Sequence, residues 1–179
     1  MKTVSTMGSG SLGCELDLDV LVSEIENKIE NSLDINFTSD GIVTLRFDDD
    51  GPAFTIYRTG TFQIRGAKTT NQLQDAKRFL LDLLNEIDLD FSHYEFEHIT
   101  SVFVADLREN VNLSGLAIEL GLESTEYEPE QFPGLVYRPE GSRFVFLIFS
   151  SGKTVITGGK FKKRAENEFR FLEKRVNKI

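Results

Sequence analysis

The sequence predicts an α+β fold with an antiparallel sheet, built from two copies of one unit. Residues 40–87 align without a gap on residues 132–179 at an offset of 92. The alignment holds about 12 identities over about 48 positions, which indicates an internal repeat. In each copy, strand-like stretches precede a long amphipathic helix. We therefore expect a pseudo-twofold protein, with a first, acidic repeat at residues 1–91 and a second repeat at residues 92–179, whose C-terminal part is basic.

Four segments carry hydrophobic residues at helical spacing, and they cover residues 18–29, 70–87, 114–120 and 163–179. Thr70 and Ser114 are available as caps for the second and third segments. The two long helices are amphipathic and should pack on a sheet. The apolar face of the last one runs from Ala165 to Ile179.

Strands are expected between these helices, near residues 41–47, 54–58, 61–65, 94–107, 134–138, 143–150 and 153–157. Turn signals separate them at Asp50-Gly51-Pro52, Thr59-Gly60, Glu140-Gly141 and Ser151-Gly152. Before the first helix, a short strand should lead into a flexible glycine-rich loop at residues 8–13.

Both faces of the second sheet are apolar. One face holds Phe144, Phe146, Ile148, Thr154 and Ile156, which suits packing under helices. The other face holds Val145, Leu147, Phe149, Val155 and Thr157. Too few helices are expected to cover both faces, so one apolar face should be open to a partner. The alternative is a sheet buried on both sides by dimerisation.

The charge of the chain is uneven. Its net charge is −9 at pH 7, yet residues 132–179 hold 11 Lys or Arg against 4 Asp or Glu. A basic segment inside an acidic protein is typical of a binding site for a polyanion such as nucleic acid. The same pattern is also compatible with a solvated helix face.

Several classes of protein are disfavoured. No apolar run approaches the roughly 18 residues that span a bilayer, and no leader opens the chain, so an intracellular protein without a membrane contact is expected. The only cysteine is Cys14 and the only histidines are His93 and His98, which leaves little for a metal site or for a nucleophile with its base. We therefore expect no enzyme, no cofactor and no metal.

Two long motifs in the second repeat carry a family resemblance. Residues 127–138 read YEPEQFPGLVYR, and residues 146–160 read FLIFSSGKTVITGGK. At this separation they closely resemble the second repeat of the TATA-box-binding protein (TBP) family. The opening LGCELDL, residues 12–18, resembles the first repeat. The resemblance covers nearly the whole chain, which looks like the archaeal-type conserved core, and the internal duplication agrees with it.

This resemblance implies a saddle: a curved antiparallel sheet with a concave apolar face on the DNA minor groove and helices on the convex face. Members of the family insert apolar side chains between base steps and kink the duplex. By position in the motif, Phe132 and Phe149 are the intercalating residues, with Tyr57 as the first-repeat counterpart of Phe149. The groove-floor positions are Leu147, Val155, Thr157, Gln63 and Arg65, and the phosphate-facing ones are Arg46, Lys68, Arg138, Lys153 and Lys160.

The first repeat departs from the family pattern. Asp40 stands at the counterpart of Phe132, and a carboxylate does not wedge between bases. Phe37, three residues earlier, is an alternative wedge. Gln63 and Arg65 stand where the second repeat has Val155 and Thr157. One half looks competent for DNA and the other looks altered.

The resemblance implies a general transcription factor that binds and bends TATA-like promoter DNA and recruits a transcription factor B-type partner. In the family an acidic segment receives that partner, and Glu128 and Glu130 match it. A homodimer is expected where DNA is absent, and the location would be the cytoplasm or nucleoid of an archaeon, or a eukaryotic nucleus. The alternatives are a diverged paralogue that regulates through protein contacts, and a nucleic-acid-positioning module for an enzyme on another chain.

Overall fold

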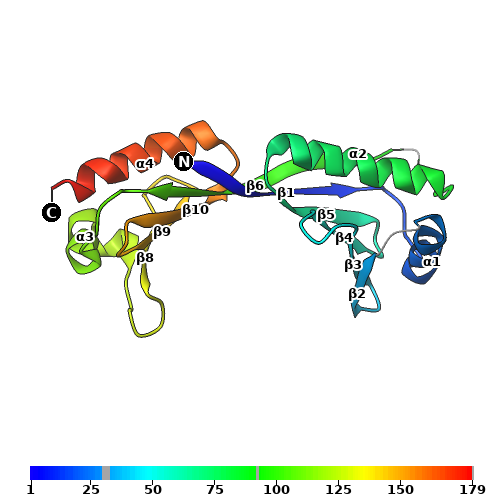
Figure 1. Cartoon of the computed structure of the whole chain (residues 1–179), viewed down its shortest axis with the longest axis horizontal. Coiled ribbons are helices and arrows are strands. Elements are labelled where there is room, and N and C mark those ends of the chain that lie inside the picture. The colour runs from blue at the N-terminus through cyan, green and yellow to red at the C-terminus, as the bar shows by residue number, and fades with distance from the viewer. Residues whose placement is uncertain (30–32, 92, 179) are drawn as a thin grey trace. The chain divides into compact units, whose positions relative to one another are not determined.

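The computed structural model describes residues 1–29, 33–91 and 93–178. It consists of two compact units. Unit 1 comprises Met1–Val4 and Thr100–Ile179, and unit 2 comprises Ser5–Ile99. The sequence predicts a boundary between the two repeats after residue 91. Residue 92 lies outside the described residues, so this boundary stays a prediction. The helices and strands follow each other in the same order in both units (Figure 1).

Unit 2 is built from β1 (Lys2–Ser11), α1 (Leu18–Lys28), β2 (Asp34–Ser39), β3 (Ile42–Arg46), β4 (Ala53–Tyr57), β5 (Thr61–Ala67) and α2 (Thr70–Glu86). Strand β6 (Glu95–Asp106) begins in unit 2 and ends in unit 1, and the first three residues of β1 also belong to unit 1. The rest of unit 1 is α3 (Leu113–Leu120), the 3-10 turn η1 (Leu122–Ser124), β7 (Thr125–Glu126), β8 (Gly134–Tyr137), β9 (Val145–Phe149), β10 (Lys153–Gly159) and α4 (Lys162–Val176).

The strands pair antiparallel in the order β2-β3-β4-β5-β1-β6-β10-β9-β8-β7. Strands β3, β4 and β5 of unit 2 pair in the same register as β8, β9 and β10 of unit 1. Phe54 faces Ile64 in unit 2, and their repeat counterparts Phe146 and Ile156 face each other in unit 1. The predicted α+β class with an antiparallel sheet is therefore confirmed.

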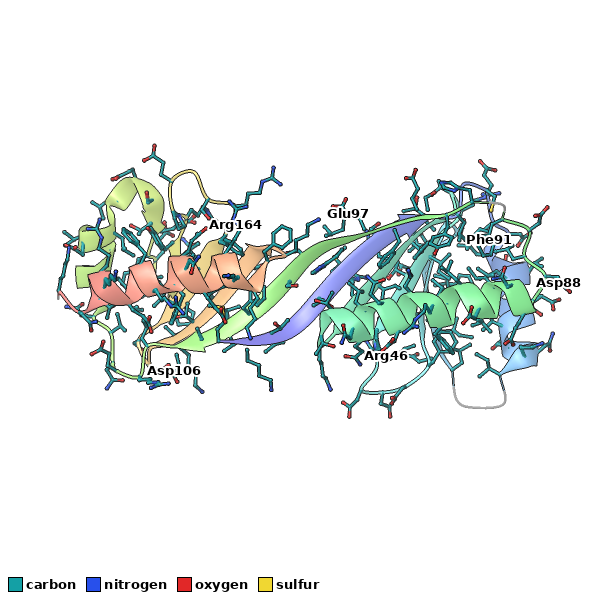
Figure 2. The ribbon with its side chains drawn as sticks, turned by 90° about the horizontal axis from the view of Figure 1, so that it is seen from above. Arg46, Asp88, Phe91, Glu97, Asp106 and Arg164 are labelled. Carbon is teal, nitrogen blue, oxygen red and sulfur yellow. The ribbon has the colours of Figure 1, made fainter. Side chains whose placement is uncertain are left out.

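In each unit the two helices pack on one face of the strands only. The helices of unit 2 share a core with the inward residues of β3, β4 and β5, in which Leu45, Ile64, Leu80 and Leu84 are fully buried. In unit 1 the equivalent core joins α3 and α4 to β8, β9 and β10. Figure 2 shows α2 and α4 each lying across the strands of its own unit. No helix among the described residues covers the opposite face of either set of strands.

Two glycines at equivalent turns explain why the backbone of the repeat is retained. Gly60 has φ 77° and its counterpart Gly152 has φ 82°, a region that L side chains rarely adopt. A side chain at either position would also strike a main-chain carbonyl oxygen, that of Cys14 or of Glu109. Both turns therefore need glycine.

The glycine-rich segment at residues 8–13 differs from its prediction as a flexible loop. Strand β1 continues through Ser11, because Gly8 and Gly10 let aromatic rings lie directly on the strand. A Cβ on Gly8 would meet the ring of Phe96, and one on Gly10 would meet the ring of Phe62. The two rings stack with centroids 5.8 Å apart. These glycines make room for the core, and they form no ligand loop.

Other local expectations are corrected as well. The caps are Thr69, whose hydroxyl accepts from the Gln72 amide at 3.0 Å, and Asn112, whose side chain accepts from the Gly115 amide at 3.1 Å; they replace the expected Thr70 and Ser114. Strands β2 and β7 were not expected, because β2 is mostly exposed and polar and β7 is only 2 residues long. The predicted core position Ile179 lies outside the described residues. No helix in the described part of the chain is long and apolar enough to cross a membrane.

Candidate nucleic-acid interface

The helix-free side of unit 1 is apolar. Along β9 and β10, Phe146, Ile148 and Ile156 are fully buried, whereas the residues between them are partly exposed. This alternation confirms the two predicted faces. We call the exposed side the open face of unit 1, and it consists of Val104, Phe132, Val136, Val145, Leu147, Phe149, Val155 and Thr157.

Phe132 and Phe149 lie together at one end of this face. Their ring centroids are 5.8 Å apart and their planes meet at 63°, an edge-to-face pair. A turn holds Phe132 in place, because its amide and that of Gln131 both donate to the Glu128 carbonyl at 2.9 Å. Phe149 is the last residue of β9 and pairs with Gly134, whose missing side chain leaves room for the Phe132 ring. The two predicted wedge residues are thus adjacent and accessible.

Leu147 and Val155 form the middle of the open face. They pair directly across β9 and β10, so their side chains project to the same side. Sequence reasoning missed two neighbours that extend this apolar floor: Val104 pairs with Val155, and Val136 pairs with Leu147. Both residues lie in strands that the sequence predicts, but the strand order that places them on this face was not predictable from the sequence.

The open face of unit 2 has the same backbone and a different chemistry. Tyr57 ends β4 on the open side and pairs with Ile42, at the place where unit 1 has Phe149 and Gly134. Asp40 lies exposed in the tight turn between β2 and β3. Phe37 is 45% exposed, but it pairs with buried Val43 and so belongs to the helix-covered side. No second aromatic ring from the described residues 33–42 accompanies Tyr57 on the open face.

Polar side chains hold the middle of the unit 2 open face. Arg65 Nη2 donates to Thr55 Oγ1 at 2.9 Å, and Thr55 Oγ1 lies 3.0 Å from Thr44 Oγ1. Gln63 pairs with Thr55 across the strands and also with Ser9 of β1. These residues occupy the positions of Val136, Leu147, Val155 and Thr157 in unit 1. The unit 2 face therefore offers hydrogen-bonding groups at all four positions, whereas unit 1 offers three aliphatic side chains and the hydroxyl of Thr157.

The residues expected at phosphates lie at the borders of the open faces. Arg46 ends β3 and donates to the Gly51 carbonyl at 3.3 Å, and Arg138 follows β8 with Nη2 3.4 Å from Glu126 Oε2. Lys153 is exposed at the start of β10, opposite Asp106. Lys68 and Lys160 follow the ends of β5 and β10. These positions are compatible with a DNA phosphate backbone that passes along the border of each open face.

Most of the basic residues in the segment 132–179 lie away from the open face of unit 1. Seven of its Lys and Arg residues fall between residues 162 and 178, in and just after α4. This helix buries Ala165, Phe169 and Leu172 against the sheet, so its charged residues project to solvent on the side away from the open face. For this part of the segment the structure favours the solvated helix face.

Glu128 and Glu130 are both exposed in the loop between β7 and β8. The Glu128 main chain orders this loop through the two hydrogen bonds that also place Phe132. Across the described residues, no group of three or more His, Cys, Asp or Glu side chains is placed to hold a metal ion.

Comparison with known proteins identifies the family. The family model described as transcription factor TFIID, or TATA-binding protein (TBP), matches residues 1–87 and 96–179. The chain belongs to the TATA-box-binding protein family. Proteins of this family are DNA-binding transcription factors and not enzymes, which agrees with the predictions from the sequence.

Archaeal members of the TBP family resemble the chain over nearly all of its length. It is 38% identical to TATA-box-binding protein 2 of Haloferax volcanii over 98% of this chain and 92% of that protein. It is 36% identical to TATA-box-binding protein C of Halobacterium salinarum over 100% of this chain and 98% of that protein. The structure of Methanococcus jannaschii TBP matches with a TM-score of 0.80 and 31% identity, over 99% of this chain and 98% of that one.

The open face of this TBP-family chain predicts unequal costs for two neighbouring substitutions. Ile148→Ala should lower the free energy of unfolding by about 2–5 kcal/mol, because it leaves a cavity in a fully buried site. Leu147→Ala should lower it by less than about 1 kcal/mol, since only cross-strand contacts on a solvated face are lost. Urea denaturation followed by circular dichroism measures both. Equal losses would mean that the open face is buried in the folded protein.

Proposed function

We propose that this protein binds TATA-like promoter DNA in the minor groove and bends it. Unit 1 lays Leu147 and Val155 on the base edges, and Phe132 and Phe149 enter between base steps at the end of the contact. The observation that carries the proposal is the accessible Phe132–Phe149 pair beside an uncovered apolar floor, in a member of a DNA-binding family. Aromatic rings replace the stacking that is lost when a base step opens, and the bend then brings more surface into contact.

The positively charged residues at the borders of the open faces support DNA binding on these faces. Lys153, Arg138 and Lys160 flank the unit 1 face, and Arg46 and Lys68 are the unit 2 counterparts of Arg138 and Lys160. Contacts between these cations and phosphates position the duplex without reading its sequence. Because such contacts release counterions from DNA, the affinity that they contribute should fall as the salt concentration rises. The net charge of −9 repels DNA, and salt screens this repulsion.

Phe149→Ala should weaken binding to a TATA-containing duplex by about tenfold or more, since stacking of a base on an aromatic ring contributes roughly 1–3 kcal/mol. Fluorescence anisotropy with labelled TATA and scrambled duplexes, over a salt series, measures the affinity. Energy transfer between dyes at the duplex ends measures the bend.

Phe171→Ala is the matched control, because this phenylalanine is 50% exposed on α4, away from the open face. It should leave affinity and bend unchanged. Equal effects of the two substitutions would exclude Phe149 as a wedge.

We also propose that Glu128 and Glu130 receive a transcription factor B-type partner. Both carboxylates are exposed in a loop that is ordered through its main chain, so a basic partner can reach them without disturbing Phe132.

The double charge reversal Glu128→Lys, Glu130→Lys should reduce recruitment of transcription factor B from the same organism to the protein–DNA complex by about tenfold or more, because like charges then oppose each other. Gel-shift titration of the partner onto a preformed complex measures this. Binary DNA binding should stay unchanged. Glu140→Lys, an exposed residue in another turn, is the control, and a similar loss there would point to net charge in place of a specific contact.

A second function is favoured by one observation on unit 2. Asp40 replaces the aromatic wedge, and Tyr57 has Ile42 as its partner in place of a second ring. A paralogue that acts as a regulator or competitor through the partner, with weak or one-sided DNA binding, would have this face. Direct binding of transcription factor B without selective binding of TATA DNA, in the assays above, would favour this function over the first.

In the absence of DNA, we expect two copies to associate through the open face of unit 1, because an apolar surface left in water favours burial. Sedimentation velocity over a concentration series should show a dimer that dissociates when TATA DNA is added in excess. Leu147→Arg should keep the protein monomeric, whereas the same change at exposed Ile118 of α3 should not. A monomer at all concentrations would contradict the expectation.

A further inference from the structure

The two open faces differ at every position where they would touch base edges. Unit 1 presents Val136, Leu147 and Val155 in a row across three paired strands. At the same places unit 2 presents Thr44, Thr55 and Gln63, with identical pairing. Because the strand pairing is the same, the two faces differ only in the side chains that they carry. Their difference lies in hydrogen-bonding capacity.

The polar groups of unit 2 are arranged across the sheet surface. The bond from Arg65 to Thr55 holds the guanidinium against the strands, and it leaves further N–H groups of Arg65 free to donate outward. Thr55 is itself only 3% exposed, because Arg65 and Thr44 lie over and beside it. The side-chain amide of Gln63 is partly exposed and makes no hydrogen bond to any of the described residues. Both an acceptor and donors are therefore available on this face.

The minor groove has a simple chemistry that separates these two faces. A·T and T·A pairs show only acceptors there, whereas a G·C pair adds the guanine amino group as a donor. The row of Val136, Leu147 and Val155 in unit 1 accepts no hydrogen bond, so it leaves that amino group desolvated and unpaired, which costs free energy. Gln63 can accept from the amino group through its Oε1 atom and donate to the neighbouring acceptors through its amide N–H groups, whereas Arg65 can only donate to those acceptors.

We propose that the open face of unit 2 is a binding site for a DNA half-site that contains G·C pairs, while the open face of unit 1 takes A·T pairs only. The inference rests on the minor-groove binding proposed above. Gln63 is the residue that accepts the guanine amino group, and Arg65 donates to the acceptors beside it. The protein should therefore accept a promoter element with A·T pairs in one half and a G·C pair in the other as readily as an element with A·T pairs in both halves.

The test uses three duplexes that differ only in the centre of the half-sites. One has A·T pairs in both halves, one carries a G·C pair in one half, and one carries a G·C pair in each half. The wild-type protein should bind the first two with equal affinity, because it can place unit 2 on the altered half. It should bind the third about tenfold more weakly, since unit 1 then meets a G·C pair.

Two reciprocal variants of the full chain complete the design. Gln63→Val with Arg65→Thr copies unit 1 onto unit 2, and it should bind the second duplex about tenfold more weakly than the first. Val155→Gln with Thr157→Arg copies unit 2 onto unit 1, and it should tolerate a G·C pair in both halves. All four substitutions lie on solvated faces, and denaturation curves verify that the variants are folded.

The outcomes separate this inference from the function on which it rests. Loss of affinity by the wild type already at the first G·C half-site would overturn the inference and leave minor-groove binding intact. The same holds if Gln63→Val with Arg65→Thr changes affinity for all duplexes equally, as expected of an arginine that enters a narrow A·T groove by charge alone. Absence of binding to every duplex, including the one with A·T pairs only, would overturn both.

Discussion

In the part of each unit that the structure describes, helices cover only one side of the strands, and this constraint shapes the rest of the molecule. Alternate residues of β9 and β10 must satisfy opposite environments: Phe146, Ile148 and Ile156 fill the core, while Leu147 and Val155 stay in contact with water. Folding stability comes from the first set. The second set is free to serve binding, and it retains apolar surface that a monomeric protein has no reason to expose.

The two repeats differ mainly on the open faces and are most alike in the core. The core keeps Phe54 with Phe146, Ile56 with Ile148, and Ile64 with Ile156 as identical pairs, along with the two turn glycines. On the open faces none of the corresponding strand residues is identical; the pairs are Thr44 with Val136, Ala53 with Val145, Thr55 with Leu147, Tyr57 with Phe149, Gln63 with Val155 and Arg65 with Thr157. Packing therefore held the scaffold constant while the exposed surface changed.

Much of this could be predicted from the sequence. The repeat indicated equal units, the alternation in residues 144–157 indicated two faces, and the long motifs indicated the family. The wrong or missing predictions concerned local backbone structure, or residues whose place depends on which strands pair. Gly8 and Gly10 suggest a loop when only the neighbouring sequence is considered. In the structure they make room for the rings of Phe62 and Phe96, which are distant in sequence. The place of Val104 in the apolar floor follows only from the strand order, which periodicity does not contain.

The close approach of Phe132 to Gly134 has an evolutionary consequence. A Cβ at position 134 would lie 2.7 Å from the Phe132 ring, so the aromatic pair of unit 1 needs glycine there. Unit 2 carries Ile42 at that place, together with Asp40. A phenylalanine placed at position 40 would meet the side chain of Ile42 where Phe132 meets Gly134, and a glycine at position 42 alone would only remove the neighbour of Tyr57. An aromatic pair like that of unit 1 would therefore require both substitutions in unit 2, so their effects on the pair are expected to be epistatic.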